Sequence, residues 1–294
     1  MKILILGLAK SGTTALAYKI HAALGLNARL EFEPDTASGA ENLSLHDDIT
    51  SIDDPVVTKN LIFPTNQMNW DNIFANVAKY DRAIWIARDP RDIIISNFFY
   101  HWFQGHKAKP EAYRLALART RAKESNPAGT PFVDLVAGTM TDNRAQLEAW
   151  QRSWYDILTG VADRISANMY VLRYEDFVDE RFGELNQYLG LSLEGDTEVA
   201  DEHRRVVRTR GYDNWRRWFT DEDIKFFRPI LSEYLNTMGY DANDWALESP
   251  DRLPAAQGSE YMEKLRSKDA RKSRRPLSSR IKSKITAILS RRRV

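Results

Sequence analysis

Several residues that can bind phosphate lie close together near the N-terminus, in the stretch GLAKSGTT at residues 7 to 14. Backbone N–H groups of a small-residue loop, a lysine ammonium and hydroxyl groups are all donors that bind anions. The loop follows the apolar residues 3 to 6 and precedes apolar residues at helical spacing, so the sequence predicts a strand, a loop and a helix. Because the positive end of the helix dipole would face the loop, we expect a phosphate site there.

The spacing of this loop excludes the phosphate loop of ATP-binding proteins. That loop has a lysine directly after its second glycine. Gly7 and Gly12 fit the pattern, but position 13 is a threonine and the lysine lies earlier. The residues expected to contact the phosphate are Lys10, Ser11, Gly12, Thr13 and Thr14. A tight turn between a strand and a helix, without a ligand, is the alternative.

A second group of anion-binding residue types follows the apolar segment 82 to 87. Arg88 comes directly after this segment, and Ser96 lies eight residues later in a helix that Asp89 is expected to cap. A guanidinium donates two hydrogen bonds to a phosphate, and a serine hydroxyl can add one more. The pair could therefore bind a second anion near the first. The alternatives are a surface arginine paired with Asp92 and an ordinary serine on a helix face.

Together the two motifs, KSGTT and RDPRDxxxS, resemble in order and spacing the motifs of sulfotransferases that use 3′-phosphoadenosine 5′-phosphosulfate (PAPS). The resemblance extends from about residue 3 to residue 240. It implies that the loop around Lys10 contacts the 5′-phosphosulfate and that Arg88 and Ser96 contact the 3′-phosphate. It also implies PAPS as the cosubstrate, no metal ion, and a single-domain, P-loop-like α/β fold in which helices cover both faces of a parallel sheet.

Two later segments extend the resemblance. In VLRYEDF, the family places the tyrosine, here Tyr174, beside the adenine, with packing at a strand end as the alternative. Residues 208 to 215, RTRGYDNW, are similar to the late family motif RKGxxGDW, although the tryptophan comes one residue early. This similarity implies that Arg210 and Gly211, and with less support Arg208, contact the 3′-phosphate.

The catalytic base is expected to be a glutamate. The branch of the family that acts on small phenols and steroids has a histidine two residues after a lysine in the third strand, whereas residues 59 to 61 here are KNL. Branches that act on carbohydrates and protein tyrosines use a glutamate after the second strand, often within Phe-Glu-Pro, and residues 32 to 34 match this. The resemblance therefore implies Glu33 as the base, with Glu31 as the rival on the same strand face.

Two lysines complete the expected catalytic set. Lys10 would stabilise charge on the departing phosphate oxygen, and Lys59 would orient the acceptor or the sulfuryl oxygens. The expected reaction is transfer of a sulfuryl group from PAPS to a hydroxyl or amine, with a glycan or glycolipid favoured as the acceptor. The alternatives are a nucleotide-dependent kinase on the same fold and a membrane-associated nucleotide-binding protein without turnover.

Strands that alternate with helices must position these residues, which predicts a doubly wound parallel sheet. After the first strand, further strands are expected at residues 28 to 32, 55 to 63, 82 to 87 and 169 to 174. Helices are expected just after residue 88 and at residues 67 to 78, 145 to 158, 180 to 189 and 221 to 238. The acceptor pocket is expected to include residues 35 to 54 and 103 to 140.

Composition narrows the class of protein. The 294 residues, 43% of them hydrophobic, suffice for one large α/β domain. The absence of cysteine excludes disulfides, thiolate metal sites and cysteine nucleophiles. No apolar run approaches the ~20 residues of a membrane-spanning helix, and the N-terminus lacks the layout of a signal peptide, so we expect a cytoplasmic protein.

The C-terminal residues differ sharply in charge from the rest. Residues 264 to 294 contain 13 lysines and arginines and one acid, so the preceding residues carry a net charge of −11 within a total of +1. We expect a sulfotransferase domain at residues 1 to 250 and a basic tail at residues 251 to 294, disordered or solvated from 264 to 275.

Within this tail, residues 276 to 294 have apolar side chains at helical spacing among basic ones, which predicts a short amphipathic helix. Such a helix could lie on an anionic membrane surface, at the inner membrane face. Binding of a polyanionic acceptor and packing on the protein's own body are the alternatives. No nucleic acid is expected as a partner.

Overall fold

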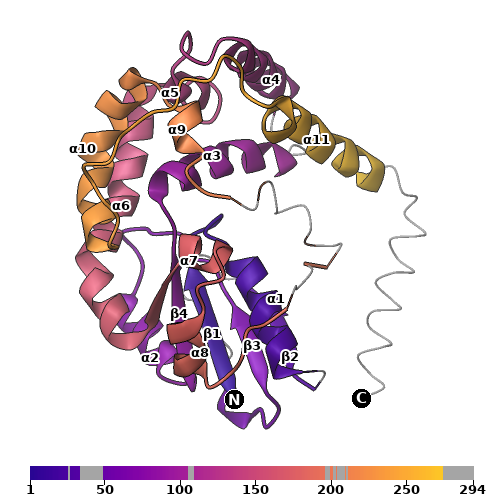
Figure 1. Cartoon of the computed structure of the whole chain (residues 1–294), viewed down its shortest axis with the longest axis vertical. Helices are drawn as coiled ribbons and strands as arrows, with labels where there is room; N and C mark the ends of the chain where they lie inside the picture. Colours follow the sequence, from indigo (N-terminus) through magenta and orange to yellow (C-terminus); the bar gives the residue numbers. More distant parts are fainter. Residues whose placement is uncertain are drawn as a thin grey trace.

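A five-stranded sheet, in the order β2, β3, β1, β4, β5, forms the centre of the computed structural model (Figure 1). The structure describes residues 1–25, 27–33, 49–104, 109–195, 199–200, 203, 209 and 211–273. The strands are β1 (Lys2–Gly7), β2 (Arg29–Phe32), β3 (Val56–Lys59), β4 (Arg82–Ala87) and β5 (Tyr170–Arg173). Each neighbouring pair is parallel, which confirms the expected α/β fold.

The central strand β1 shows why the sheet is covered on both faces. Its side chains alternate between two core clusters, with Leu4 and Leu6 in one and Ile3 and Ile5 in the other. All four are fully buried. An uninterrupted apolar run is what a central strand of a parallel sheet requires, because neither of its faces meets water.

Helices form the two outer layers. The face with Ile3 and Ile5 packs on α1 (Thr13–Leu24) and α8 (Gly183–Leu189). The face with Leu4 and Leu6 packs in one cluster with α2 (Trp70–Val77), α6 (Arg144–Asn168) and α10 (Asp221–Thr237).

The remaining helices are mostly gathered beyond the carboxyl ends of the strands, where Figure 1 shows α3, α9 and α11. They are α3 (Pro90–His101), α4 (Pro110–Ser125), α5 (Phe132–Val136), α7 (Tyr174–Val178), α9 (Trp215–Trp218) and α11 (Ser259–Ser273). Three short 3₁₀ helices are η2 (Ile49–Ser51), η3 (Trp102–Gln104) and η5 (Ala255–Gln257). In an open parallel sheet, this edge is where ligands bind.

Helix α11 corrects one expectation about the tail. Residues 264 to 275 were expected to be disordered or solvated, but α11 extends to Ser273. Of these residues Leu265 is buried in the core cluster of α6 and α10, whereas Lys264 and Ser267 are exposed to solvent. The first residue of α11, Ser259, donates from its backbone and its hydroxyl to the buried carboxylate of Glu124.

The boundary at residue 250 stays a prediction, and the amphipathic helix expected at residues 276 to 294 lies outside the described residues. Among the helices that the structure describes, none combines the length and the apolar character that crossing a membrane requires.

Candidate active site

Two glycines at the loop between β1 and α1 lie so close to neighbouring residues that a side chain would not fit at either position. A Cβ on Gly7 would lie 2.8 Å from the Ile86 carbonyl oxygen, and a Cβ on Gly12 would lie 2.5 Å from the Tyr174 ring. Gly12 also has a left-handed φ of 98°, and Lys10 has a φ of 74°. Gly12 is the N-cap residue of α1, and glycine has no side chain with which to cap it. The N-terminus of α1 therefore keeps its capacity to bind an anion.

The hydroxyl residues of this loop differ in their surroundings. Ser11 is fully buried, and both its hydroxyl and its backbone N–H donate to the Leu8 carbonyl oxygen, at 2.8 and 3.2 Å. Ser11 therefore maintains the turn in this conformation, and its contact with the cofactor stays a prediction. Thr13 is buried and Thr14 is half-buried in the first turn of α1.

Arg88 joins the two predicted anion-binding motifs. It lies just beyond β4 and is 5% exposed, so it is not a surface arginine. Its Nη1 donates to the Lys10 carbonyl oxygen at 2.8 Å, and its Nη2 donates to the Gly211 carbonyl oxygen at 3.2 Å. Its guanidinium lies 4.1 Å from the centre of the Tyr174 ring, and Asp92 forms an ion pair with it at 3.6 Å. Arg88 thus connects the loop, α3 and the late segment.

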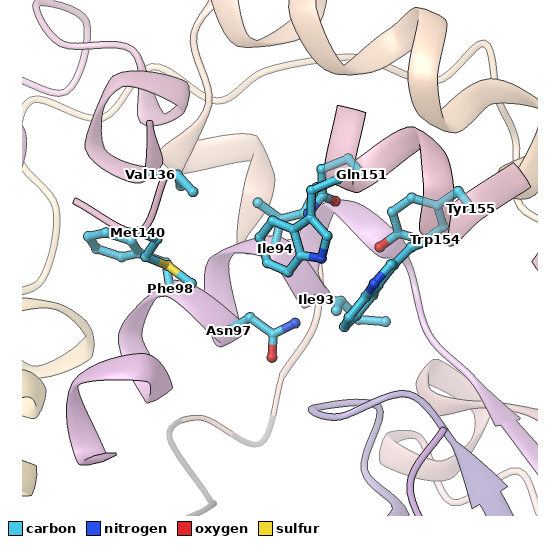
Figure 2. Close-up of a pocket in the computed structure, with 10 residues that line it drawn as sticks. Ile93, Ile94, Asn97, Phe98, Val136, Met140, Gln151, Trp154 and Tyr155 are labelled. Atoms are coloured by element: carbon cyan, nitrogen blue, oxygen red, sulfur yellow. The ribbon is translucent and has the colours of Figure 1, made fainter. Parts of the chain in front are cut away.

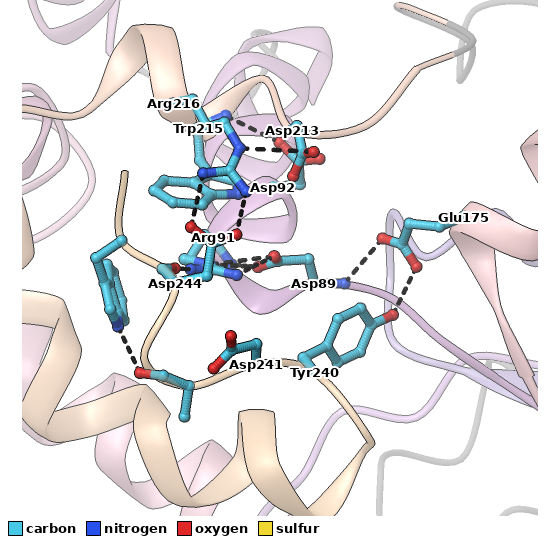
Figure 3. Close-up of polar contacts among 12 residues, drawn as sticks. Asp89, Arg91, Asp92, Glu175, Asp213, Trp215, Arg216, Tyr240, Asp241 and Asp244 are labelled. Atoms are coloured by element: carbon cyan, nitrogen blue, oxygen red, sulfur yellow. Dashed lines mark hydrogen bonds and ion pairs between the residues drawn. The ribbon is translucent and has the colours of Figure 1, made fainter. Parts of the chain in front are cut away.

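Asp89 caps α3 as expected, and further contacts that the sequence did not predict fix the start of this helix (Figure 3). The Asp89 carboxylate accepts hydrogen bonds from the Arg91 backbone at 2.8 Å and from the Arg91 guanidinium. That guanidinium lies between the rings of Trp215 and Trp245, 3.9 and 4.8 Å from their centres. The Asp92 carboxylate accepts a hydrogen bond from the Trp215 backbone at 3.1 Å. The start of α9 is thereby held against the helix that follows Arg88.

Glu175, in α7, contacts both Tyr240 and the residue that caps α3. The Tyr240 hydroxyl donates to Glu175 at 2.7 Å, and the Asp89 backbone N–H points at the other carboxylate oxygen at 3.4 Å. Burial raises the pKa of Glu175, although the hydrogen bond from Tyr240 opposes the shift. Because Glu175 follows Tyr174 directly, these contacts also hold the tyrosine that lies under Arg88.

Helix α3 brings Ser96 and Tyr100 toward the loop. Ser96 is 5% exposed, and its hydroxyl makes no hydrogen bond with the part of the chain that the structure describes. One turn later, the Tyr100 ring lies 3.9 Å below the Lys10 ammonium. The predicted catalytic lysine therefore lies where the loop meets α3.

Glu33 and Lys59, the other predicted catalytic residues, form an ion pair. Lys59 Nζ lies 2.5 Å from Glu33 Oε1, and the lysine side chain is 4% exposed while the glutamate side chain is 33% exposed. Burial lowers the pKa of Lys59, and the Glu33 carboxylate opposes the shift. The pair lies at the carboxyl ends of β2 and β3, at the edge where the loop after β1 also lies.

The expectation that Glu31 and Glu33 share a strand face is wrong. Leu30 and Phe32 pack in the core cluster of α1, so Glu31, between them, lies on the opposite face, in register with Thr58. Strand β2 ends at Phe32, and Glu33 has a left-handed φ of 46°, so the alternation of the strand does not extend to it.

Arg208, Arg210 and Pro34 lie outside the described residues, whereas Gly211 contacts Arg88 through its carbonyl oxygen. Among the described residues, no group of three or more histidine, aspartate or glutamate side chains could hold a metal ion.

A family model described as the sulfotransferase domain matches residues 1 to 216. The chain belongs to the sulfotransferase family. A crystal structure of mouse sulfotransferase SULT7A1 complexed with PAP is similar in fold, with a TM-score of 0.51 and 15% sequence identity. The alignment covers 83% of this chain and 89% of the mouse chain. No match was found among curated protein sequences. The family expected from the two motifs is thus confirmed, and this sulfotransferase has the fold that the motifs imply.

Proposed function

We propose that this sulfotransferase moves the sulfuryl group of PAPS to a hydroxyl or amine of a glycan or glycolipid. The observation that carries the proposal is the position of Arg88, which connects the loop around Lys10 to Gly211. Its Nε is buried and has no hydrogen-bond partner among the described residues. A buried guanidinium N–H without an acceptor is costly, and a phosphate oxygen would satisfy it.

The surrounding residues fit a nucleotide with phosphates at two positions. The N-terminus of α1 and Lys10 would hold the phosphosulfate, while Arg88 and Ser96 would hold the 3′-phosphate. Ser96 fits this role because the residue is only 5% exposed and its hydroxyl makes no hydrogen bond to the residues that the structure describes. The mouse sulfotransferase of similar fold was crystallised with PAP, which supports PAPS as the cosubstrate here.

Glu33, directly after β2, and Lys59, the last residue of β3, would act on the acceptor. PAPS supplies an activated sulfuryl group. As the acceptor oxygen forms its bond to sulfur, the bond from sulfur to the 5′-phosphate oxygen breaks, and the acceptor proton passes to the Glu33 carboxylate. Lys59 positions that carboxylate through the ion pair, and Lys10 stabilises the charge that appears on the departing phosphate. A carboxylate base at this place, instead of a histidine, supports an acceptor of the carbohydrate type.

Calorimetry and an acceptor screen test this proposal. We expect PAP to bind tightly without Mg²⁺, and ATP with Mg²⁺ to bind weakly. Labelled PAPS should then give sulfated product with one or more members of a panel of glycans and glycolipids. Binding of ATP that requires Mg²⁺, without binding of PAP, would indicate the kinase alternative. Binding of PAP without transfer to any acceptor would indicate a protein that has lost turnover.

We further propose that the enzyme is cytoplasmic and that residues 276 to 294 contact an anionic membrane surface. The support is the spacing of Ile281, Ile285 and Ile288 among basic residues. The full chain should float with phosphatidylcholine vesicles that contain phosphatidylserine and not with phosphatidylcholine alone. Replacing the three isoleucines by serine should abolish flotation, and equal flotation would contradict the proposal.

A further inference from the structure

The side chain of Lys10 lies against an aromatic ring of α3. Its ammonium is 3.9 Å from the centre of the Tyr100 ring, within the range of a cation–π contact. Both residues are half-buried, so the ammonium has lost part of its hydration and the negative face of the ring attracts it more strongly than at an open surface. The contact joins the proposed catalytic lysine to a helix that the loop around Lys10 does not include.

The backbone of Lys10 is held separately from this contact. Its carbonyl oxygen accepts the hydrogen bond from Arg88 Nη1 at 2.8 Å, and its φ of 74° lies in the left-handed region. These features fix the backbone, but a lysine side chain still has many rotamers, and restricting them costs entropy. A group that restricts the rotamers before the reaction begins lowers the cost of bringing the ammonium to the reacting atoms.

Tyr100 is itself fixed by packing. Its ring stacks on Phe103, with ring centres 5.5 Å apart and planes inclined by 21°. Ser96 lies four residues earlier, on the same face of α3. The face with Ile94 and Phe98 packs toward α5 and α6 and leaves a cavity of only about 10 Å³, the size of about one water (Figure 2). This packing opposes rotation of α3 about its axis, so the ring stays beside Lys10.

We infer that Tyr100 is a positioning residue for Lys10, whose ammonium its ring holds for contact with the departing phosphate oxygen. The inference rests on the proposed function, in which Lys10 stabilises the charge on that oxygen. Because the ring face makes the contact, the phenol hydroxyl is not required. Tyr100 contributes to the rate of sulfuryl transfer more than to PAP affinity, since Arg88, Ser96 and the N-terminus of α1 are unaffected by its loss.

Release of labelled sulfate from saturating PAPS, without an acceptor, measures this contribution. Water then forms the bond to sulfur, the bond from sulfur to the 5′-phosphate oxygen breaks, and the products are sulfate and PAP. Tyr100→Leu should lower the rate constant about tenfold, which corresponds to about 1.4 kcal/mol. Tyr100→Phe keeps the ring and should stay within about twofold of the wild type. PAP affinity, measured by calorimetry, should change less than about threefold in both variants.

A double-mutant cycle with Lys10→Met separates positioning from a direct role of the tyrosine. If the ring acts through Lys10, adding Tyr100→Leu to Lys10→Met should change the rate constant less than about twofold. A tyrosine that contacted the sulfuryl group itself would instead lower the rate about equally with and without the lysine.

Nuclear magnetic resonance gives a readout that does not depend on turnover. The ring current of Tyr100 should shift the ε-methylene protons of Lys10 upfield of those of the other lysines. The shifted signal is identified by its loss in Lys10→Met. It should persist in Tyr100→Phe and disappear in Tyr100→Leu.

The control is Tyr188→Leu, which removes a ring that lies 5.5 Å from the Arg82 guanidinium at the amino end of β4, the opposite edge of the sheet. It should change neither the rate constant nor PAP affinity. If Tyr100→Leu does not fold, Tyr100→Met, which keeps more of the side-chain volume, replaces it.

Several results would overturn the inference. They are a rate in Tyr100→Leu equal to or above that of the wild type, a Tyr100→Phe variant as slow as Tyr100→Leu, equal losses with and without Lys10, and an unshifted Lys10 signal in the wild type. PAP binding without any release of sulfate by the wild type would also overturn it and would leave nucleotide binding intact. If PAP does not bind, the proposed function fails first and the inference fails with it.

Discussion

The ammonium of Lys59 lies 2.5 Å from the carboxylate of Glu33, although 26 positions separate the two residues along the chain. Parallel pairing of β2 with β3 places Phe32 opposite Lys59. The left-handed backbone conformation of Glu33 then directs the Glu33 side chain toward the lysine. The Glu33 backbone N–H also donates to the Lys59 carbonyl oxygen at 2.8 Å. Two contacts thus fix the proposed base at the edge of the sheet.

The first prediction concerns the role of this carboxylate. Glu33→Gln keeps the shape of the side chain but cannot accept the acceptor proton, so kcat should fall roughly 10²–10⁴-fold. PAP affinity, measured by calorimetry, should stay within about twofold, because the residues proposed to hold the phosphates lie on the loop and on α3.

Glu31→Gln is the matched control, since Glu31 lies on the opposite face of β2. It should leave kcat nearly unchanged. A near-normal rate in Glu33→Gln together with a large loss in Glu31→Gln would transfer the role of base to Glu31.

The second prediction concerns Arg88. Arg88→Gln removes the guanidinium that contacts the Lys10 and Gly211 carbonyl oxygens, and with it the proposed contact to a phosphate. Charge-assisted hydrogen bonds contribute ~1.5–3 kcal/mol, so PAP affinity should fall about tenfold or more. Arg114→Gln, at an exposed position on α4, removes an equal charge and should not change PAP affinity. Equal affinity in wild type and Arg88→Gln would contradict the assignment.

The juxtaposition of Lys10 and Arg88 could be predicted from the sequence. Each residue follows a buried strand, and strands β1 and β4 are neighbours, so their carboxyl ends meet at one edge. Apolar runs and the order of strands and helices determine this part of the site. Tyr174 and Gly211 also lie near it, but only the resemblance to the family implied this, not the pattern of strands and helices.

Other features of the fold and the site depend on backbone turns and long-range packing, which the spacing of apolar residues along the sequence does not reveal. The backbone turn at Glu33, with its φ of 46°, decides which face its carboxylate reaches. The packing of Arg91 between two tryptophans unites residues more than 120 positions apart, and no local pattern predicts it. Helix α6 continues beyond the amphipathic segment 145 to 158, through Gly160 to Asn168, because tertiary packing of Ile165 outweighs the ~1 kcal/mol cost of an interior glycine.

The third prediction concerns the close approach of Gly12 to Tyr174. In Gly12→Ala, the new methyl group would lie 2.5 Å from the tyrosine ring, and the residue would keep a φ of 98°. We expect a loss of about 2–4 kcal/mol in the free energy of unfolding, from strain and overpacking together. PAP affinity should also fall, since the displaced ring supports Arg88.

Gly25→Ala separates the two effects. Gly25 also has a left-handed φ, 89°, but nothing lies within 4 Å of its Cβ position. Only the backbone strain should remain, about 1–3 kcal/mol at the ψ of −178° that Gly25 has, without a change in PAP affinity. Urea unfolding and calorimetry of both variants measure these quantities, and equal effects in the two variants would refute the proposed close contact.

The fourth prediction uses Lys123, a fully buried lysine of α4 that donates to the carbonyl oxygens of Pro127 and Thr130 at 2.9 and 2.6 Å. Burial lowers the pKa of Lys123 to about 8, although Asp223 opposes the shift. The folded protein therefore releases this proton near pH 8, whereas the unfolded chain keeps it until about pH 10.4. Between these values the unfolded state binds more protons, so the contribution of Lys123 to stability rises with pH.

Lys123→Met lacks this contribution. The free energy of unfolding of the wild type minus that of Lys123→Met should therefore increase by about 2 kcal/mol between pH 7 and pH 9.5, from 1.36 kcal/mol for each pH unit above the folded pKa. Urea unfolding at the two pH values measures the difference. Lys225→Met, at an exposed position on α10, should show no such change. A difference that stays constant with pH would mean that Lys123 remains protonated in the folded protein, stabilised by its two carbonyl acceptors and by Asp223.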